Sequence, residues 1–214
     1  MPSTALALLS RPAPEDASGS GGHRLVDPAD PQVNVLDFGV TRGDGVFETI
    51  SIGGGRLQAL DAHLARFARS AASLDLPAPD LRAWRDAIHA VAGAIDPTPE
   101  AFVKTVLTRG VEGAGSGATG WAYAAPASDF TAVRRDGIRV VTLDRGYRHD
   151  IAQTAPWLLA GSKTLSYAVN RAVLREAARR EADDAVFVSS DGFLLEGSTS
   201  NLLLRVGDKL VTPS

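Results

Sequence analysis

The chain has 214 residues, of which 44% are hydrophobic and 22% are charged, a composition typical of a globular protein rather than a disordered one. Its net charge of −3, without a dense run of lysine or arginine, argues against nucleic acid as a partner. The lack of cysteine excludes disulfides and thiolate metal sites, and the four histidines do not have the paired spacing of metal ligands. No apolar run is long enough for a membrane helix, and the early run at 5–9 lacks the basic flank of a signal peptide. We therefore expect a cytoplasmic protein that binds no metal and no membrane.

Helices and hairpins alternate along the first half of the chain. The elements expected there are, in chain order, a polar loop (11–22), a β-hairpin (46–52 with 56–60), a helix running to Leu74, a helix following Pro79 and a pair of strands (102–107 with 121–125). The hairpin is expected to turn at the three consecutive glycines 53–55, and Asp61 is the expected N-cap of the first helix.

The second half of the chain repeats this mixture of elements. After a crossing segment (126–136), the expected elements are a strand (138–143), a helix (165–180) and two strands (185–189 and 202–206) on either side of a turn at 191–192. Helices mixed with hairpins that look antiparallel indicate an α+β fold. We expect two domains, an N-terminal α+β domain over 1–127 and a second domain over 128–214. A strand pattern runs almost to Ser214 and would leave an unpaired edge, so we expect a C-terminal part of the second domain to be missing.

Two short motifs in the second half carry residues suited to cofactor chemistry. Lys163 follows Gly161 near the expected start of a helix, and Glu196 opens the run EGSTSN, which ends at Asn201. A pyridoxal-phosphate enzyme needs both residue types, a lysine amine for a Schiff base with the aldehyde and an acid that keeps the pyridine nitrogen protonated. The simpler alternatives are a solvated lysine and a glutamate at the surface end of a strand. Only two lysines, Lys104 and Lys163, precede residue 209, and this scarcity favours the cofactor role.

Four motifs occur in the order and with the spacing of a known family. They are the run DFGVTRGDGVFET (37–49), the run HLAR (63–66) and the segments around Lys163 and Glu196. Together they resemble the fold-type IV pyridoxal-phosphate enzymes, which include branched-chain aminotransferases, D-amino-acid aminotransferases and 4-amino-4-deoxychorismate lyase. The resemblance extends from about Asp27 to Pro213, and four motifs in register are far more specific than any one of them. It implies an N-terminal α/β sandwich, a mixed barrel-like C-terminal domain that is truncated here, and a homodimer with its active site near the subunit boundary.

The resemblance also implies which residues bind pyridoxal 5'-phosphate. Lys163 would bind the cofactor and act as the base that moves the substrate proton, and Glu196 would face the pyridine nitrogen. Arg66 would bind the phosphate, because a forked guanidinium suits a dianion, and His63 would lie beside it on the same helix face. Three residues that follow the glutamate would help to hold the cofactor, namely Ser198, Thr199 and Asn201. The alternatives are a solvent-facing pair on the helix and a set of turn-forming residues.

Within this family the sequence is most similar to 4-amino-4-deoxychorismate lyase. Phe47 stands where D-amino-acid aminotransferases place a tyrosine, and the segment after Arg109 lacks the arginine and histidine with which they trap a substrate carboxylate. Lys104, five residues before Arg109, resembles the lyase. The resemblance thus implies substrate contacts from Phe47, Lys104 and Arg109 and a catalytic acid at Thr49. The lyase carries an arginine near the position of Ala114, so part of the substrate anchoring is unexplained, and Lys104 has an alternative role as a solubility lysine on an edge strand.

Three functions are therefore open. The first is a lyase that converts 4-amino-4-deoxychorismate to 4-aminobenzoate and pyruvate, a step of folate biosynthesis. The second is a transaminase of branched-chain or D-amino acids, since the core machinery is shared. The third is a truncated, non-catalytic relative, which is suggested by the absence of a later Gly-Ile-Thr-like phosphate loop before the chain ends at Ser214.

Overall fold

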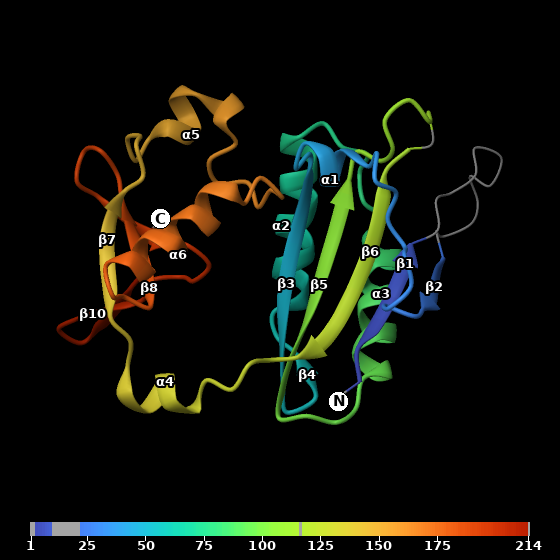
Figure 1. Cartoon of the computed structure of the whole chain (residues 1–214), viewed down its shortest axis with the longest axis horizontal. Helices are drawn as coiled ribbons and strands as arrows, with labels where there is room; N and C mark the ends of the chain where they lie inside the picture. The colour runs from blue at the N-terminus through green and yellow to red at the C-terminus, as the bar shows by residue number, and fades with distance from the viewer. Residues whose placement is uncertain (1–2, 10–21, 116, 214) are drawn as a thin grey trace. The chain divides into compact units, whose positions relative to one another are not determined.

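The computed structural model describes residues 3–9, 22–115 and 117–213, and Figure 1 shows the elements that they form. The chain divides into two compact units. The first comprises Met1–Ser128 together with Ser162–Ser166, and the second comprises Asp129–Gly161 and Tyr167–Ser214. The short segment that carries Lys163 thus belongs to the first unit, although both of its flanks belong to the second. The loop expected at 11–22 lies, except for Gly22, outside the described residues.

A six-stranded antiparallel sheet forms the centre of the first unit, in the order β2-β1-β6-β5-β3-β4. Its strands are β1 (Ala5–Leu9), β2 (His23–Val26), β3 (Gly45–Gly53), β4 (Arg56–Leu57), β5 (Glu100–Thr108) and β6 (Thr119–Pro126). The expected hairpin and the expected pair of strands are both present, as β3 with β4 and β5 with β6. The short apolar run at 5–9 was not expected to be a strand, and it pairs with β6 as β1.

Two helices cover one face of this sheet, as Figure 1 shows, and a third, α1 (Phe38–Thr41), is a single turn. They are α2 (Leu60–Ser73), which packs on β3, and α3 (Leu81–Ala94), which packs on β1, β5 and β6. The alternating residues Val46 and Ile50 of β3 are fully buried beneath them. The rings of Phe67 and Trp84 meet edge to face at 4.8 Å and join the two helices. This arrangement is a two-layer α/β sandwich.

The helix starts differ in how well the sequence predicts them. Asp80, which directly follows Pro79, caps α3, because its carboxylate accepts hydrogen bonds from the backbone N–H groups of Arg82 and Ala83. Asp61 is not the N-cap of α2, and that prediction is wrong. Ala59 occupies the cap position in the left-handed region, with φ of 49°, and Asp61 lies in the first turn of the helix. An acidic residue in the first turn is still favourable, because it faces the positive end of the helix dipole.

The second unit contains a mixed three-stranded sheet in the order β7-β8-β9. β7 (Val140–Asp144) pairs in parallel with β8 (Asp184–Val188), and β8 pairs antiparallel with β9 (Leu194–Gly197). The parallel pair is connected through α6 (Ala168–Arg179), whose Ala177 is fully buried against this sheet. The remaining elements are α4 (Thr131–Asp136), α5 (Ile151–Thr154), the 3-10 turn η1 (Pro156–Leu158) and the hairpin of β10 (Leu204–Val206) with β11 (Lys209–Val211).

The helix expected at 165–180 begins three residues later than predicted. Thr164 makes an isolated antiparallel bridge with Val46 of β3, and Leu165 donates its backbone N–H to the carbonyl of Gly45 at 2.8 Å. Because these residues are extended along the edge of a strand, the helix starts only at Ala168. Within the described ranges, no helix combines the length and apolar character needed to cross a membrane.

Candidate active site

Lys163 is held against the free edge of β3. Its carbonyl accepts the backbone N–H of Phe47 at 3.0 Å, and its own N–H donates to the hydroxyl of Ser70 on α2 at 3.1 Å. Together with the bond from Leu165 to Gly45, these contacts fix the lysine backbone to both layers of the first unit. Ser70 is itself buried. The backbone of Lys163 is therefore held by a strand and a helix.

The Phe47 ring lies beside two lysine amines. The Nζ atom of Lys163 is 4.3 Å from its centroid, and the Nζ atom of Lys104 is 5.2 Å from it. Both distances are within the range in which the negative face of an aromatic ring attracts a cation. The structure thus brings together three residues that the sequence placed in the site, from β3, β5 and the segment 162–166.

A buried carboxylate links β3 to α2. Glu48 is only 1% exposed, and its two oxygens accept the Nε and Nη2 hydrogens of Arg66, each at 2.6 Å. His63 Nδ1 lies 2.9 Å from the same carboxylate. Arg66 and His63 are three residues apart and share one face of α2, as expected. This bidentate contact fixes the plane of the Arg66 guanidinium, whose side chain is 41% exposed.

Thr49 lies on the opposite face of the sheet from Glu48. It is exposed, and it is paired with Lys104 across β3 and β5, so the two side chains leave the sheet on the same side. Thr49 and Lys104 therefore lie side by side on the face that α2 and α3 leave uncovered.

Arg109 is engaged by other parts of the first unit. Its Nε donates to Asp44 at 2.6 Å, and Nη2 donates to the carbonyl of Leu74 at 2.6 Å. A weaker bond from Nη1 reaches the carbonyl of Asp75 at 3.3 Å. The hydrogen bond with Asp44 raises the pKa of Arg109 above its ordinary value. These contacts tie the end of β5 to the end of α2, and a substrate would have to compete with them.

In the second unit, the run that begins with Glu196 forms a compact turn. Glu196 is exposed on β9 and accepts a hydrogen bond from the amide of Asn201 at 2.8 Å. Ser198 is buried, and its hydroxyl donates to Asp184 at 2.9 Å while its carbonyl accepts from Asn170 at 2.6 Å. Tyr167 also donates to this carbonyl, and burial raises the pKa of its phenol. Thr199 is exposed beside this turn. The Ser198 side chain therefore stabilises the turn that presents Glu196.

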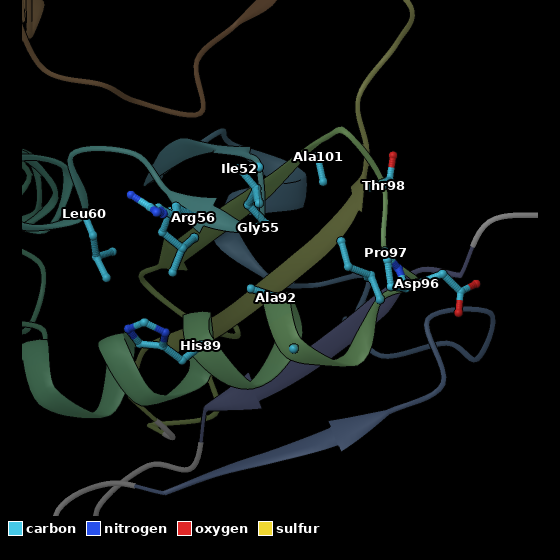
Figure 2. Close-up of a pocket in the computed structure, with 14 residues that line it drawn as sticks. Ile52, Gly55, Arg56, Leu60, His89, Ala92, Asp96, Pro97, Thr98 and Ala101 are labelled. Carbon is cyan, nitrogen blue, oxygen red and sulfur yellow. The ribbon is translucent and has the colours of Figure 1, made fainter.

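A groove with a volume of about 720 Å³ lies elsewhere in the first unit, as Figure 2 shows. It runs between the β3–β4 turn and the C-terminal half of α3, and Arg56, His89 and Asp96 are among the residues around it. None of the residues that the sequence assigns to the site lines this groove. Among the residues that the structure describes, no group of three His, Asp or Glu side chains is arranged to hold a metal ion.

Comparison with known proteins identifies the family. Residues 45–214 match the family "Amino-transferase class IV". The chain belongs to this family. A fold IV-transaminase from Curtobacterium pusillum has 52% identity and a TM-score of 0.89 over 99% of this chain and 72% of its own. A hypothetical aminotransferase from Mycobacterium tuberculosis, solved with pyridoxal phosphate bound, has 39% identity and a TM-score of 0.83 over 97% of this chain and 70% of its own.

A curated relative in the class IV aminotransferase family has two activities in its name. It is the bifunctional aminodeoxychorismate lyase / D-amino acid transaminase of Mycobacterium tuberculosis, 43% identical over 86% of this chain. The chain spans 65% of the length of that relative. These matches confirm the predicted family and the α+β fold of type IV, and they confirm pyridoxal 5'-phosphate as the cofactor.

The residues of the first unit fit this cofactor. A phosphorylated aldehyde needs an amine and an anion-binding group at fixed positions. Lys163 carries an amine and Arg66 a guanidinium, and both residues are tied to β3 and α2. Sequence reasoning did not find Ser70, which supports Lys163 from one helical turn beyond Arg66. The sequence spacing could have indicated Ser70, because a residue four positions after Arg66 lies on the same face of the helix.

Proposed function

We propose that this class IV aminotransferase-family protein is a pyridoxal-phosphate-dependent lyase acting on 4-amino-4-deoxychorismate. The reaction breaks the C–O bond to the enolpyruvyl group and yields pyruvate and 4-aminobenzoate. The observation that carries the proposal is the Lys163 amine at 4.3 Å from the Phe47 ring, with the Lys104 amine beside the same ring. The lyase activity in the name of the 43% identical relative supports it.

We assign four parts of the site to the cofactor. Lys163 would hold the aldehyde carbon through Nζ, and the guanidinium of Arg66 would bind the phosphate. Glu196 would hold the proton on the pyridine nitrogen, within a turn that Ser198, Thr199 and Asn201 form. When bound, pyridoxal phosphate supplies an electron sink at the carbon that bears the substrate amine.

The reacting protons would be handled by residues of the first unit. The amine of Lys163, once released, would take the proton from the carbon that bears the substrate nitrogen. Lys104 would pair with a substrate carboxylate, and Phe47 would pack against the substrate ring. Thr49, the neighbour of Lys104 across the strands, would hold the hydroxyl proton that is delivered to the enolpyruvyl methylene. Arg109 is the least supported of the proposed substrate contacts, because Asp44 and two carbonyls already engage it.

A direct assay tests the lyase proposal. The full chain is loaded with pyridoxal phosphate and incubated with 4-amino-4-deoxychorismate in the absence of any keto acid. We expect equal amounts of 4-aminobenzoate and pyruvate, and we expect no product from Lys163→Ala. Borohydride treatment followed by mass spectrometry should place the reduced cofactor on Lys163 and not on Lys104 or Lys209. Cofactor on another lysine would contradict the assignment.

A D-amino-acid transaminase is the second candidate, because the same relative also carries that activity in its name. Phe47 in place of a tyrosine and the lack of an arginine and histidine after Arg109 argue against it. D-alanine with 2-oxoglutarate serves as the matched assay. Pyruvate that forms only when 2-oxoglutarate is present would support the transaminase, and its formation without release of 4-aminobenzoate in the first assay would replace the lyase proposal.

We also propose that the protein is a cytoplasmic homodimer, as the resemblance to the family implies. Sedimentation of the full chain at several concentrations measures the oligomeric state. We expect a species of twice the mass of one chain. A monomer that is nevertheless active in the lyase assay would exclude a dimer as a requirement for the site.

A further inference from the structure

Glu48 occupies a position at which an apolar side chain would be expected. It lies between Val46 and Ile50 on the face of β3 that α2 covers, and both neighbours are fully buried. Burial of a carboxylate is unfavourable unless it is paired and hydrogen-bonded. Glu48 meets this requirement entirely through α2, by its two bonds to Arg66 and its contact with His63. Because such a pair costs desolvation, we ask what the contact does for Arg66.

The contact converts a flexible side chain into a fixed one. Arginine has several rotatable bonds, and ordering it when a ligand binds has an entropic cost. The fork geometry of the bond to Glu48 sets the plane and the direction of the guanidinium before any ligand arrives. The anchored end of this pair is 1% exposed while the Arg66 side chain is 41% exposed. A phosphate that approaches from solvent therefore meets an oriented group.

The same framework holds the lysine. Phe47, the residue before Glu48, donates its backbone N–H to Lys163, and Ser70 on the helix face of Arg66 accepts the N–H of Lys163. The same short stretch of β3 and the same two turns of α2 therefore hold both the Lys163 backbone and the Arg66 guanidinium. Their separation is fixed by these two elements.

We propose that Glu48 is a positioning residue for the cofactor phosphate, acting through Arg66. This inference rests on the proposed function, since it assigns the phosphate to Arg66. Glu48 itself touches neither cofactor nor substrate. By orienting the guanidinium at a set distance from Lys163, it makes the protein select pyridoxal phosphate over pyridoxal, which has the same aldehyde and ring but lacks the phosphate ester.

The test compares these two compounds as probes. Apo full-length protein is titrated with pyridoxal phosphate and separately with pyridoxal, and the dissociation constants are measured by fluorescence for the native protein, Glu48→Gln and Glu48→Asp. We expect Glu48→Gln to weaken pyridoxal phosphate binding about tenfold, as loss of a charge-assisted hydrogen bond would, while pyridoxal binding is unchanged. Glu48→Asp keeps the charge but shortens the reach, so we expect an intermediate loss. Equal weakening of both probes, or of neither, would overturn the inference.

The Arg66→Met variant, alone and combined with Glu48→Gln, separates this inference from the proposed function. In Arg66→Met, the preference for pyridoxal phosphate should fall, and adding Glu48→Gln should have no further effect on the ratio of the two dissociation constants. If Arg66→Met keeps the native preference, Arg66 does not bind the phosphate, and the proposed function fails at that residue together with the inference. If Arg66→Met loses the preference and Glu48→Gln keeps it, only the role of Glu48 is wrong. Far-ultraviolet circular dichroism of each variant checks that it is folded, and Glu48→Asp provides the readout if Glu48→Gln does not fold.

Discussion

At the scale of single residues, the site depends on cations placed around one aromatic ring. Phe47 has the amines of Lys163 and Lys104 within 4.3 and 5.2 Å of its centroid. Two positive groups near one ring repel each other, while both are attracted to its face. An anionic substrate group that pairs with Lys104 would reduce this repulsion. The two lysines therefore have different proposed roles although they share a neighbour.

Replacing Lys104 tests its share in substrate binding. Because Lys104→Met removes the cation but keeps much of the side-chain length, we expect KM for the substrate to rise about tenfold, the effect of losing an ionic contact of roughly 1.4 kcal/mol, with a smaller change in kcat. Steady-state kinetics measure both constants. Lys209→Met, in the exposed strand β11, is the matched control and should leave KM unchanged. A fall in kcat alone would contradict a role in binding.

Arg109 provides the opposite case, a residue whose contacts are structural. Arg109→Lys loses the fork to Asp44 and the bonds to the carbonyls of Leu74 and Asp75. We expect the free energy of unfolding to fall by about 1–2 kcal/mol, because lysine cannot replace all four hydrogen bonds at this partly exposed position. Urea denaturation measures this change, and Arg69→Lys on the exposed side of α2 is the control. An unchanged stability together with a raised KM would instead support the substrate contact inferred from the sequence.

At the scale of elements, the close contact between β3 and the segment 162–166 needs a glycine. A Cβ atom at Gly45 would lie 2.7 Å from the carbonyl oxygen of Leu107 and 2.7 Å from Cδ1 of Leu165. The strand β5 on one side cannot move without breaking the sheet. The segment that carries Lys163 would therefore have to shift.

Gly45→Ala should thus impair cofactor binding indirectly, by displacing the segment 162–166 that carries Lys163. We expect a loss of about 1–3 kcal/mol of stability from overpacking and a lower yield of cofactor fixed to Lys163 by borohydride. Mass spectrometry of the peptide containing Lys163 measures the yield. Gly93→Ala is the matched control, because an added Cβ there meets nothing within 4 Å and lies in the helix α3, where alanine is favoured. A normal yield in Gly45→Ala would contradict the importance of this contact.

Hydrophobic periodicity predicted the elements of the first unit well, and it failed where tertiary contacts dominate. The alternation in 102–107 and 121–125 is present as β5 and β6, because each strand has one face on the helices and one face that they leave uncovered. The run at 5–9 has no alternation and became a strand only through β6. The start of α6 was misplaced because 163–165 follow the edge of β3, a partner far away in the sequence. Local signals contain no information about such partners.

In the site, too, local sequence motifs pointed to single residues but not to the contacts between elements. The motifs predicted roles for Lys163, Arg66 and Lys104, and these roles stay predictions. The structure brings the two lysine amines to the Phe47 ring and pairs Arg66 with Glu48. The pairing of Glu48 with Arg66 spans 18 residues and two elements, so no spacing rule reveals it. Glu48 lies under the helix, whereas its strand neighbour Thr49 is exposed. Nothing in the composition of a strand indicates which of two adjacent polar residues faces the core.

At the scale of the whole molecule, the chain is divided into two units that each have their own sheet. In the second unit, the Asp191 carboxylate has several partners. Hydrogen bonds from Ser189 and from His149 hold the pKa of Asp191 well below its ordinary value of 3.8. Arg148 lies 3.7 Å away and adds a second positive group. The ionised carboxylate is thus the form that the folded unit prefers.

This preference predicts a pH-dependent stability. Because the pKa is lowered on folding, Asp191 stabilises the unit fully above pH 3.8 and loses this contribution as the pH falls below that value toward the lowered pKa. Asp191→Asn should therefore destabilise β8 and β9 at neutral pH, and its difference from the native protein should shrink in acid. Hydrogen exchange of the β8 and β9 amides at several pH values measures this. Asp208→Asn, at a fully exposed position, is the control. A difference that grows toward acid pH would contradict the assignment.

The path of the chain has a consequence for when the protein becomes chemically competent. Ser166 and Gly43 are 123 residues apart in sequence and are joined by a hydrogen bond, and the bond from Lys163 to Ser70 closes a loop of 93 residues. Long loops close late, because entropy opposes them until the sheet and helices on either side have formed. We therefore expect the Lys163 amine to reach its place late in folding. Under the proposed role of Lys163, we expect a chain that has completed only its first sheet not to bind the vitamin-derived aldehyde.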